Sequence, residues 1–334
     1  MSRLCHSATS SPCHIQTPTD VFRTEYPSAE FFMKEQQNIF WTAHEIHLEK
    51  DVHDVLTNFT ESEKHGVLTT LKLFTLYEMK AGTDYWTGRF MKMFPRHEFQ
   101  SMAGMFGAME LSVHKPFYNK INELLNATND DFYTEYVNNP TLRSRMDFID
   151  SVIDHPSDLV SIAGFCLVEG VVLYSSFAFL KHFQSLGKNK LVNVVRGINS
   201  SAIDEDLHCH AAAYSFKELK YQLTLTQEQW ISVQENIIDI ANTIIEHEDC
   251  IIDMIFEKGD IDGITKSQMK VFISERVSYC LDLLDMNPMY NTNIPLGVIS
   301  SWFYKGMKSY NMNDFFTGKG REYQRSWNEE KFTW

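Results

Sequence analysis

The sequence predicts an all-α protein built as a helical bundle. From Ser28 onward, apolar residues recur at intervals of three and four along most of the chain, which is the spacing of one helical face. Helix-start signals precede several of these segments, and the clearest is the capping box formed by residues 60–63 (Thr-Glu-Ser-Glu). The sequence contains no convincing strand alternation and no glycine-rich phosphate loop.

The expected helices follow one another through short connections that contain proline, glycine or a capping residue. Pro95 precedes the second long helix, Ser157 caps an apolar helix that Gly187 ends, and Thr226 begins a second capping box. The first 26 residues lack helical periodicity and are expected to form a flexible arm. The expected helices cover residues 60–86, 99–125, 129–137, 140–154, 157–187, 191–219, 226–258 and 266–286.

Residues 159–180 form an apolar stretch with a single charged side chain, Glu169. This stretch is long enough to cross a membrane. However, no other candidate span lies nearby and the flanking Lys and Arg residues are not asymmetric, so we expect the central, fully buried helix of a large soluble bundle. A carboxylate there is costly unless it is paired or bound to a metal.

Charge and cysteine pattern argue against some classes of function. The 334 residues carry a formal net charge of -14, and no run of Lys or Arg suggests a surface for nucleic acid or an anionic membrane. The six cysteines are scattered without a Cys-x-x-Cys pair, and no signal peptide precedes the helices. We therefore expect free thiols in a reducing cytoplasm.

Carboxylates and histidines fall at positions of the long helices that should face inward. Glu205 and His208 form a Glu-x-x-His pair whose side chains share one helical face. A second acid–histidine pair and one acid from each of two further helices complete the four-carboxylate, two-histidine set of ferritin-like di-metal bundles. These ligands suit iron or manganese, and the absence of thiolates from the set argues against structural zinc. The candidate metal ligands are Glu78, Glu110, His114, Glu169, Glu205 and His208.

Each member of this set has an ordinary interpretation when taken alone. A single Glu-x-x-His is common on helices, and Glu78 by itself would equally fit a surface acid. Histidines on surface helices are usually solvated, and we expect this of His44, His47, His53, His97 and His182. The complete set is harder to dismiss, because its order along the sequence is acid, acid–His, acid, acid–His, and because Glu169 interrupts an apolar helix.

In this order and context, the chain resembles the small subunit of class I ribonucleotide reductase from about residue 40 to the C-terminus. The segment AIDEDLHCHA is similar to the Asp-Glu-x-x-His run of that family, LVEGVVLYSSFAF resembles its third ligand helix, and TLKLFTLYEM resembles its first. His114 and Tyr118 keep the family's spacing of four between a ligand histidine and the radical tyrosine.

The resemblance implies a role for several further residues. Tyr118 would carry the radical, with Phe117, Phe165 and Phe177 as its protecting apolar neighbours. Dioxygen or a derived oxidant would react at the two ions and oxidise Tyr118. The oxidising equivalent would then pass through His114, Asp204, Trp41 and Tyr323 to a cysteine of the large subunit, where ribonucleotides are reduced. Without the other matches, we would interpret Trp41 and Asp204 as an ordinary core tryptophan and helix-face acid.

The sequence departs from the family pattern at the first two ligand positions. Glu78 stands where the family usually has Asp, and Glu110 is separated from His114 by three residues instead of two. Pro116 cannot donate to the Ser112 carbonyl, which favours a local kink or π-bulge. Our hypothesis is that this irregular turn lets Glu110 reach the metals. Cys166 and Cys209 also lie near the expected site, with no evident role beyond filling the core.

The sequence therefore predicts an arm over residues 1–26, a ferritin-like helical domain over 27–310 and a C-terminal tail over 311–334 that docks on the large subunit. A packed final segment is the alternative for the tail. We expect a homodimer with two iron ions, while Mn/Fe and Mn/Mn pairs and an activating flavoprotein remain open. The alternative functions are a ferritin-like di-metal oxygenase and a metal-storage or ferroxidase bundle.

Overall fold

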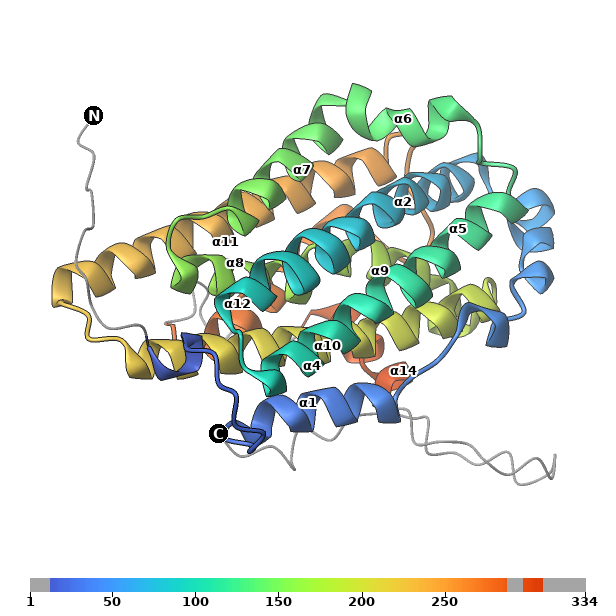
Figure 1. Cartoon of the computed structure of the whole chain (residues 1–334). Helices are drawn as coiled ribbons and strands as arrows, with labels where there is room; N and C mark the ends of the chain where they lie inside the picture. Colours follow the sequence, from blue (N-terminus) through green and yellow to red (C-terminus); the bar gives the residue numbers. More distant parts are fainter. Residues whose placement is uncertain (1–12, 287–296, 309–334) are drawn as a thin grey trace.

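The computed structural model describes residues 13–286 and 297–308, and within them long helices lie side by side in one bundle (Figure 1). An isolated bridge between Ile261 and Ile264 is the sole β-pairing among these described residues, so the all-α prediction is confirmed. The main helices are α1 (Pro27–Asn38), α2 (Glu61–Met79), α4 (His97–Met109), α5 (Lys115–Leu124), α6 (Asp130–Asn138), α7 (Pro140–Ile153), α8 (Asp158–Val171), α9 (Tyr174–Lys181), α10 (Val192–Gln222), α11 (Gln227–Ile255) and α12 (Lys266–Leu283).

Short helical elements fill the connections between the main helices. The short α-helices are α3 (Met91–Met93), α13 (Val298–Phe303) and α14 (Lys305–Lys308). The 3-10 turns are η1 (His14–Gln16), η2 (Ala43–Glu45), η3 (Leu48–Lys50) and η7 (His182–Gly187). The segments with π-helical geometry are η4 (Asp54–Asn58), η5 (Lys80–Phe90) and η6 (Glu110–His114).

The predicted helix starts are confirmed by their hydrogen bonds. At the start of α2, the Glu63 backbone N–H donates to Thr60 Oγ1 at 3.2 Å, and the Thr60 N–H donates to Glu63 Oε2 at 2.8 Å. Thr226 and Gln229 form the same reciprocal box before α11. Each box satisfies two backbone donors that the first turn of a helix leaves unpaired.

Two of the long helices pass through π-helical turns without ending. Helix α2 continues through η5 into α3, and α4 continues through η6 into α5. The second of these turns spans Glu110–His114 and ends two residues before Pro116, so of the predicted kink or π-bulge the structure has the π-bulge. A π turn accommodates one residue more than an α turn, and it therefore changes which side chains share a face.

The long apolar segment is a buried core helix, as the soluble interpretation predicted. The most apolar 18-residue window of the stretch Asp158–Ser185 has a mean hydropathy of 1.8 and is completely buried inside the bundle. Helix α8 packs against α7, α10, α11 and α12. Its surroundings are therefore protein on several sides, which explains why nearly every position along it is apolar.

The same segment is not one continuous helix, which corrects the expectation for residues 157–187. It breaks at Val172 and Leu173, between α8 and α9. Two buried arginines bond the carbonyls that the break exposes: Arg145 donates to Val172 O, and Arg276 Nε donates to Gly170 O at 2.9 Å. The break is therefore stabilised from other helices, which local sequence could not reveal.

Two further expectations differ from the structure. His182 was expected at the surface but is fully buried, and burial lowers its pKa to about 3, so the ring stays neutral. Residues 13–26 of the expected arm contact the bundle, where Ile15 is fully buried and its N–H donates to Gln222 Oε1 at 2.9 Å. The apolar side chain of Ile15 supplies the contact that an arm of polar residues would lack.

Arg145 also pairs with Glu248 of α11 at 3.0 Å, and both side chains are buried. We expect Arg145→Met to lower the free energy of unfolding by about 3–5 kcal/mol at pH 8, because Glu248 loses its partner and must either hold an unpaired buried charge or bind a proton. Urea unfolding would measure this loss. The matched control, Arg143→Met, removes an exposed 3.8 Å pair with Asp147 and should cost at most about 1 kcal/mol.

The cost of Arg145→Met should also depend on pH. Burial raises the pKa of Glu248 from its ordinary 4.5 to about 7, so its favourable contribution is complete below pH 4.5 and is lost as the pH rises to 7. Without Arg145 this pKa rises further and the loss continues above pH 7. The difference from wild type should therefore grow by about 1 kcal/mol between pH 6 and pH 8. A difference independent of pH would contradict this account.

Candidate metal centre

The structure brings all six predicted ligand side chains together in the core. They come from helices that are distant in sequence, and each side chain is at most 1% exposed. Glu78 lies at the end of α2, Glu110 and His114 bound the π turn η6, and Glu169 lies in α8. The remaining two, Glu205 and His208, lie in the middle of α10.

The six residues form two groups that share two carboxylates. One group is Glu78, Glu110, His114 and Glu205, and the other is Glu110, Glu169, Glu205 and His208. Within each group, the ligand atoms all lie within 4.8 Å of one another. Glu110 and Glu205 belong to both groups, so each would be able to offer an oxygen to either of two ions.

The individual distances fit metal coordination. His114 Nδ1 lies 2.8 Å from Glu110 Oε2 and 3.4 Å from Glu205 Oε1. His208 Nδ1 lies 2.8 Å from Glu110 Oε1 and 3.7 Å from Glu205 Oε2. Two ligand atoms about 2.1 Å from one ion and at right angles to each other are about 3.0 Å apart, so these separations suit shared ions.

The π turn explains how Glu110 joins the cluster despite its unusual spacing. With one extra residue in the turn, Glu110 and His114 still point to one side of the helix. Gly82 lets η5 approach this turn closely, because a Cβ there would lie 2.7 Å from Leu111 Cγ and 3.0 Å from Glu110 Cβ. The ligand helices could not pack at this distance with a larger residue at 82.

The outer nitrogen of each histidine has a fixed partner. His114 Nε2 lies 2.8 Å from Asp204 Oδ2, and His208 Nε2 lies 3.0 Å from Gln36 Oε1. Both partners accept hydrogen bonds, so each Nε2 carries a proton and Nδ1 is the nitrogen available to a metal. Gln36 also donates to Asp204 Oδ1 at 2.8 Å and so connects the two histidine partners.

Gln36 and Trp86 are site residues that the sequence analysis missed. The Trp86 indole N–H donates to Glu169 Oε1 at 2.8 Å and fixes the orientation of that carboxylate. Trp86 lies eight residues after Glu78, about two helical turns along the same helix, and this spacing was an available signal. Gln36 lies in a separate helix, α1, and nothing in the sequence linked it to the site.

The electrostatics of the cluster call for cations. Burial raises the pKa of Glu78 and of Glu169 well above the usual value, and the neighbouring carboxylates Glu110 and Glu205 add to the effect. Burial opposes the positive charge of His114, but Glu110, Asp204 and Glu205 together outweigh burial and hold the pKa of His114 well above the usual value. Without metal, protons balance the four carboxylates, and divalent ions would replace those protons.

Orphaned oxygen atoms test whether metal ions fit. Both carboxylate oxygens of Glu78 and both of Glu205 are buried without a hydrogen-bond partner within the described part of the protein. A buried carboxylate without a partner is strongly unfavourable, whereas oxygen coordination to a hard cation satisfies it. The residues present therefore fit two ions with carboxylate and imidazole ligands.

The remaining predicted site residues lie beside the cluster, except for one. Asp204 Oδ2 accepts from the Trp41 indole N–H at 2.8 Å, so one acid contacts both Trp41 and His114. Tyr118 is fully buried and stacks on Phe74 with ring centroids 4.1 Å apart. Tyr323 lies outside the described residues.

Of the three apolar neighbours expected around Tyr118, one has a described ring contact with it and the other two stack on different rings. Phe117 packs against Tyr118 at 5.1 Å, and Phe177 stacks on Phe74 at 5.7 Å. Phe165 stacks on Tyr85 instead. Phe74, which the sequence analysis did not name, makes the closest ring contact with Tyr118 among those described.

Metal loading should stabilise the fold. Anaerobic addition of Mn(II) or Fe(II) is expected to raise the thermal unfolding midpoint by at least about 5 °C, because the ions bind the folded protein and neutralise its buried carboxylates. Scanning calorimetry before and after loading would measure the shift, and a chelator should reverse it. An unchanged midpoint in protein that retains two ions per subunit would contradict this expectation.

Removal of a shared carboxylate should disrupt both ion positions. We expect Glu110→Ala to weaken metal binding by more than about 100-fold, so that fewer than two ions per subunit remain after dialysis. Elemental analysis by plasma mass spectrometry would measure this. Glu123→Ala, an exposed acid on the same continuous helix, is the control. Retention of two ions by Glu110→Ala would disprove the proposed role of the π turn.

Comparison with known proteins agrees with this geometry. The model of the family "Ribonucleotide reductase, small chain" matches residues 18–295. A probable ribonucleoside-diphosphate reductase small subunit of Invertebrate iridescent virus 3 is 24% identical, and the match covers 90% of this chain with 83% of the viral protein. A ribonucleoside-diphosphate reductase small chain of Variola virus is 23% identical, and the match covers 91% of each protein.

Solved structures share the fold. The dimanganese(II)-NrdF of Streptococcus sanguinis superposes with a TM-score of 0.76 at 19% identity, and the match covers 87% of this chain with 99% of that protein. The ribonucleotide reductase R2 subunit of Clostridium botulinum gives a TM-score of 0.75 at 19% identity, and here 85% of this chain matches 89% of that subunit. With its buried carboxylate–histidine cluster and a family match over most of its length, the chain belongs to the ribonucleotide reductase small-chain family and is a small subunit of ribonucleoside-diphosphate reductase.

Proposed function

We propose that this small subunit uses two metal ions to oxidise Tyr118 to a neutral radical, and that it passes the oxidising equivalent to the large subunit for ribonucleotide reduction. The observation that carries the proposal is the continuous set of contacts on one side of the metal cluster. His114 bonds Asp204, Asp204 bonds Trp41, and Tyr118 lies one helical turn after His114.

The ions supply the redox equivalents when they are bound. We expect an iron pair, with Mn/Fe and Mn/Mn pairs as the alternatives. The relative from Streptococcus sanguinis is a dimanganese protein, which supports keeping manganese among the choices. Glu78, in the place of the family's usual Asp, has a longer arm and more freedom to change how it binds the first ion.

The surroundings of Tyr118 suit a protected radical. Stacking on Phe74 and contact with Phe117 exclude water from the ring. Burial, followed by the negative charge of Glu78, raises the pKa of Tyr118 well above 10, so the phenol keeps its proton until it is oxidised. Loss of the electron then requires loss of that proton from Oη, and Glu78 is the carboxylate with the largest electrostatic effect on it.

The route out of the cluster follows the hydrogen bonds. Asp204 Oδ2 accepts from both His114 and Trp41, so a change of charge at either ring is felt by the same carboxylate. Trp41 is fully buried, but the adjacent Phe40 is 42% exposed. The route therefore comes within one residue of the surface, where a partner can dock.

The remaining steps involve the tail and the partner. We propose that Tyr323, in the tail of residues 311–334, receives the equivalent from Trp41 and transfers it to the large subunit, and that Phe332 and Trp334 anchor the tail there. The subunit would act as a homodimer in the cytoplasm, with an activating flavoprotein if manganese is the metal. Family membership favours this function over a di-metal oxygenase or a storage bundle.

Substitution of the radical residue tests the proposal. We expect Tyr118→Phe to bind two metal ions like wild type, because no ligand changes, but to show no tyrosyl signal by electron paramagnetic resonance after activation. Activity with the large subunit should fall to background. Tyr174→Phe is the matched control, since Tyr174 is equally buried and its hydroxyl donates to a backbone carbonyl, Ala202 O, at 3.3 Å.

Comparison with the control variant shows which tyrosine carries the radical. Wild type and Tyr174→Phe should give the same tyrosyl signal per pair of ions. A full signal in Tyr118→Phe would assign the radical to another tyrosine, and turnover without any radical in wild type would remove Tyr118 from the mechanism.

A further inference from the structure

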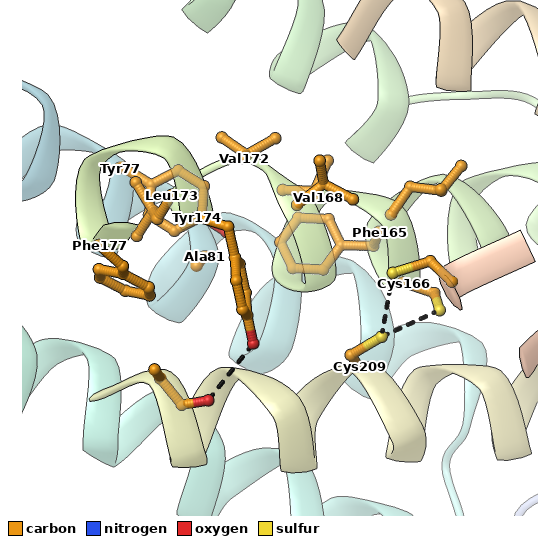
Figure 2. Packing of buried hydrophobic residues seen from close by; sticks show 14 of the residues in the cluster. Tyr77, Ala81, Phe165, Cys166, Val168, Val172, Leu173, Tyr174, Phe177 and Cys209 are labelled. Atoms are coloured by element: carbon orange, nitrogen blue, oxygen red, sulfur yellow. Dashed lines mark hydrogen bonds between the residues drawn. The ribbon is translucent and has the colours of Figure 1, made fainter. Parts of the chain in front are cut away.

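Three cysteine thiols converge in the core on the α8 side of the metal centre. Cys166 of α8, Cys209 of α10 and Cys280 of α12 are all fully buried, and we call them the thiol cluster. Cys209 Sγ lies 3.5 Å from Cys166 Sγ and 3.7 Å from Cys280 Sγ. A dashed line in Figure 2 marks the contact between Cys166 and Cys209. The central sulfur therefore contacts both of the others.

The backbone leaves room for this convergence. A Cβ at Gly170 would lie 2.8 Å from Cys209 Sγ and would collide with Cys280 Sγ. A disulfide bond is about 2.05 Å long, so Cys166 and Cys209 need to approach by only about 1.5 Å to form one. Cysteines that serve only to fill a core have no need to place their sulfurs in mutual contact.

Two members of the thiol cluster lie close to metal ligands on the same helices. Cys166 is three residues before Glu169, and Cys209 directly follows His208. Full burial protects these thiols from oxidants in the solvent. An oxidant generated inside the core, at the metal centre, would reach them without crossing the protein surface.

Two aromatic side chains connect the centre with the thiol cluster. Trp86 donates to Glu169 Oε1 at 2.8 Å and packs edge-on against Tyr85, with ring centroids 5.1 Å apart. Tyr85 stacks on Phe165, the residue before Cys166. Tryptophan, tyrosine and cysteine side chains can each be oxidised by one electron, so Trp86, Tyr85 and Cys166 are all redox-capable groups.

We propose that Trp86, Tyr85 and the thiol cluster form an oxidant sink, which takes up oxidising equivalents that Tyr118 does not receive. This inference rests on the proposed function, because the equivalents arise from the reaction of dioxygen at the two ions. The sink lies on the Glu169 side of the metal centre, whereas Tyr118 and Trp41 lie on its His114 side.

The reaction balances with dioxygen as the oxidant. Cys166 and Cys209 each lose a proton and an electron, their two S–H bonds break and one S–S bond forms. The two electrons pass through Tyr85 and Trp86, and two further electrons come from the two divalent ions. With the two thiol protons and two protons from solvent, one dioxygen is reduced to two waters.

Mass spectrometry tests the sink on the full-length protein. Wild type is loaded anaerobically with Fe(II), exposed to air without an external reductant, then denatured in acid and alkylated. We expect a cross-linked peptide pair containing Cys166 and Cys209, which is absent from metal-free protein given the same air. Exposed Cys250 should remain alkylated in both samples and reports complete labelling.

Variants test the path. Tyr85→Phe keeps the ring that stacks on Phe165 but removes the oxidisable phenol, and it should reduce the cross-link to the metal-free level at unchanged iron content. Tyr174→Phe, equally buried, should behave as wild type. Cys209→Ser should lose the cross-link, while Cys280→Ser should keep it.

The outcomes separate the two proposals. Thiols that all remain reduced in the loaded wild type would overturn the sink; if the Tyr118 radical forms in that sample, the proposed function still stands, and if it does not, both fall. An equal cross-link in metal-free protein would also overturn the sink, because the oxidant would then not arise at the metals. An unchanged yield in Tyr85→Phe would overturn it as well, because the electrons would not pass through the proposed path.

Discussion

The burial of four carboxylates in one dry interior is the constraint on which the rest of the structure depends. Glu78, Glu110, Glu169 and Glu205 are each at most 1% exposed, and water cannot stabilise their charge there. Two histidines, a few hydrogen-bond donors and two cations must do so. Because one ion binds several ligands at once, ion binding stabilises an arrangement in which helices converge on one point. The bundle is built around that convergence. The metal centre is therefore part of the core and is not a site added to a finished surface.

Backbone irregularity is the means by which the ligands reach that point. This sequence has one residue more between Glu110 and His114 than the usual acid–histidine pair of the family. The π turn η6 absorbs that residue, and the close approach of η5 at Gly82 keeps the neighbouring helix against it. On α8, the break after Val171 lets Arg145 and Arg276 bond backbone carbonyls deep in the core. These irregularities are stabilised by partners on other helices, which is why they persist in an otherwise regular bundle.

The sequence predicted the features that local chemistry determines. Capping boxes at Thr60 and Thr226 fixed the starts of two helices, and the order of acids and histidines identified the six side chains that the structure brings together. Pro116 likewise indicated an irregular turn beside the site, either a kink or a π-bulge, and the structure has a π turn there. Features determined by tertiary contact escaped prediction: Gln36 reaches the site from α1, the α8–α9 break depends on distant arginines, and His182 is buried although it resembles a surface residue. A single sequence without its contacts carries no signal for such pairings.

The two sides of the metal cluster differ in a way that gives direction to its chemistry. On the His114 side, Asp204 accepts from a ligand histidine and from Trp41 through one oxygen, which couples the centre to the outer helices by charge and proton position. On the Glu169 side, Trp86 donates to a ligand but is surrounded by rings, including Phe106 and Phe165, with no carboxylate relay beyond it among the residues described. In the proposed mechanism, a hole on the first side would be transferred through Trp41, because the shared carboxylate Asp204 can stabilise charge at either ring. On the second side, the proposed sink would end at the thiols, where two one-electron oxidations would form an S–S bond. The polar side would thus serve transfer, and the aromatic side would serve the removal of excess oxidising equivalents.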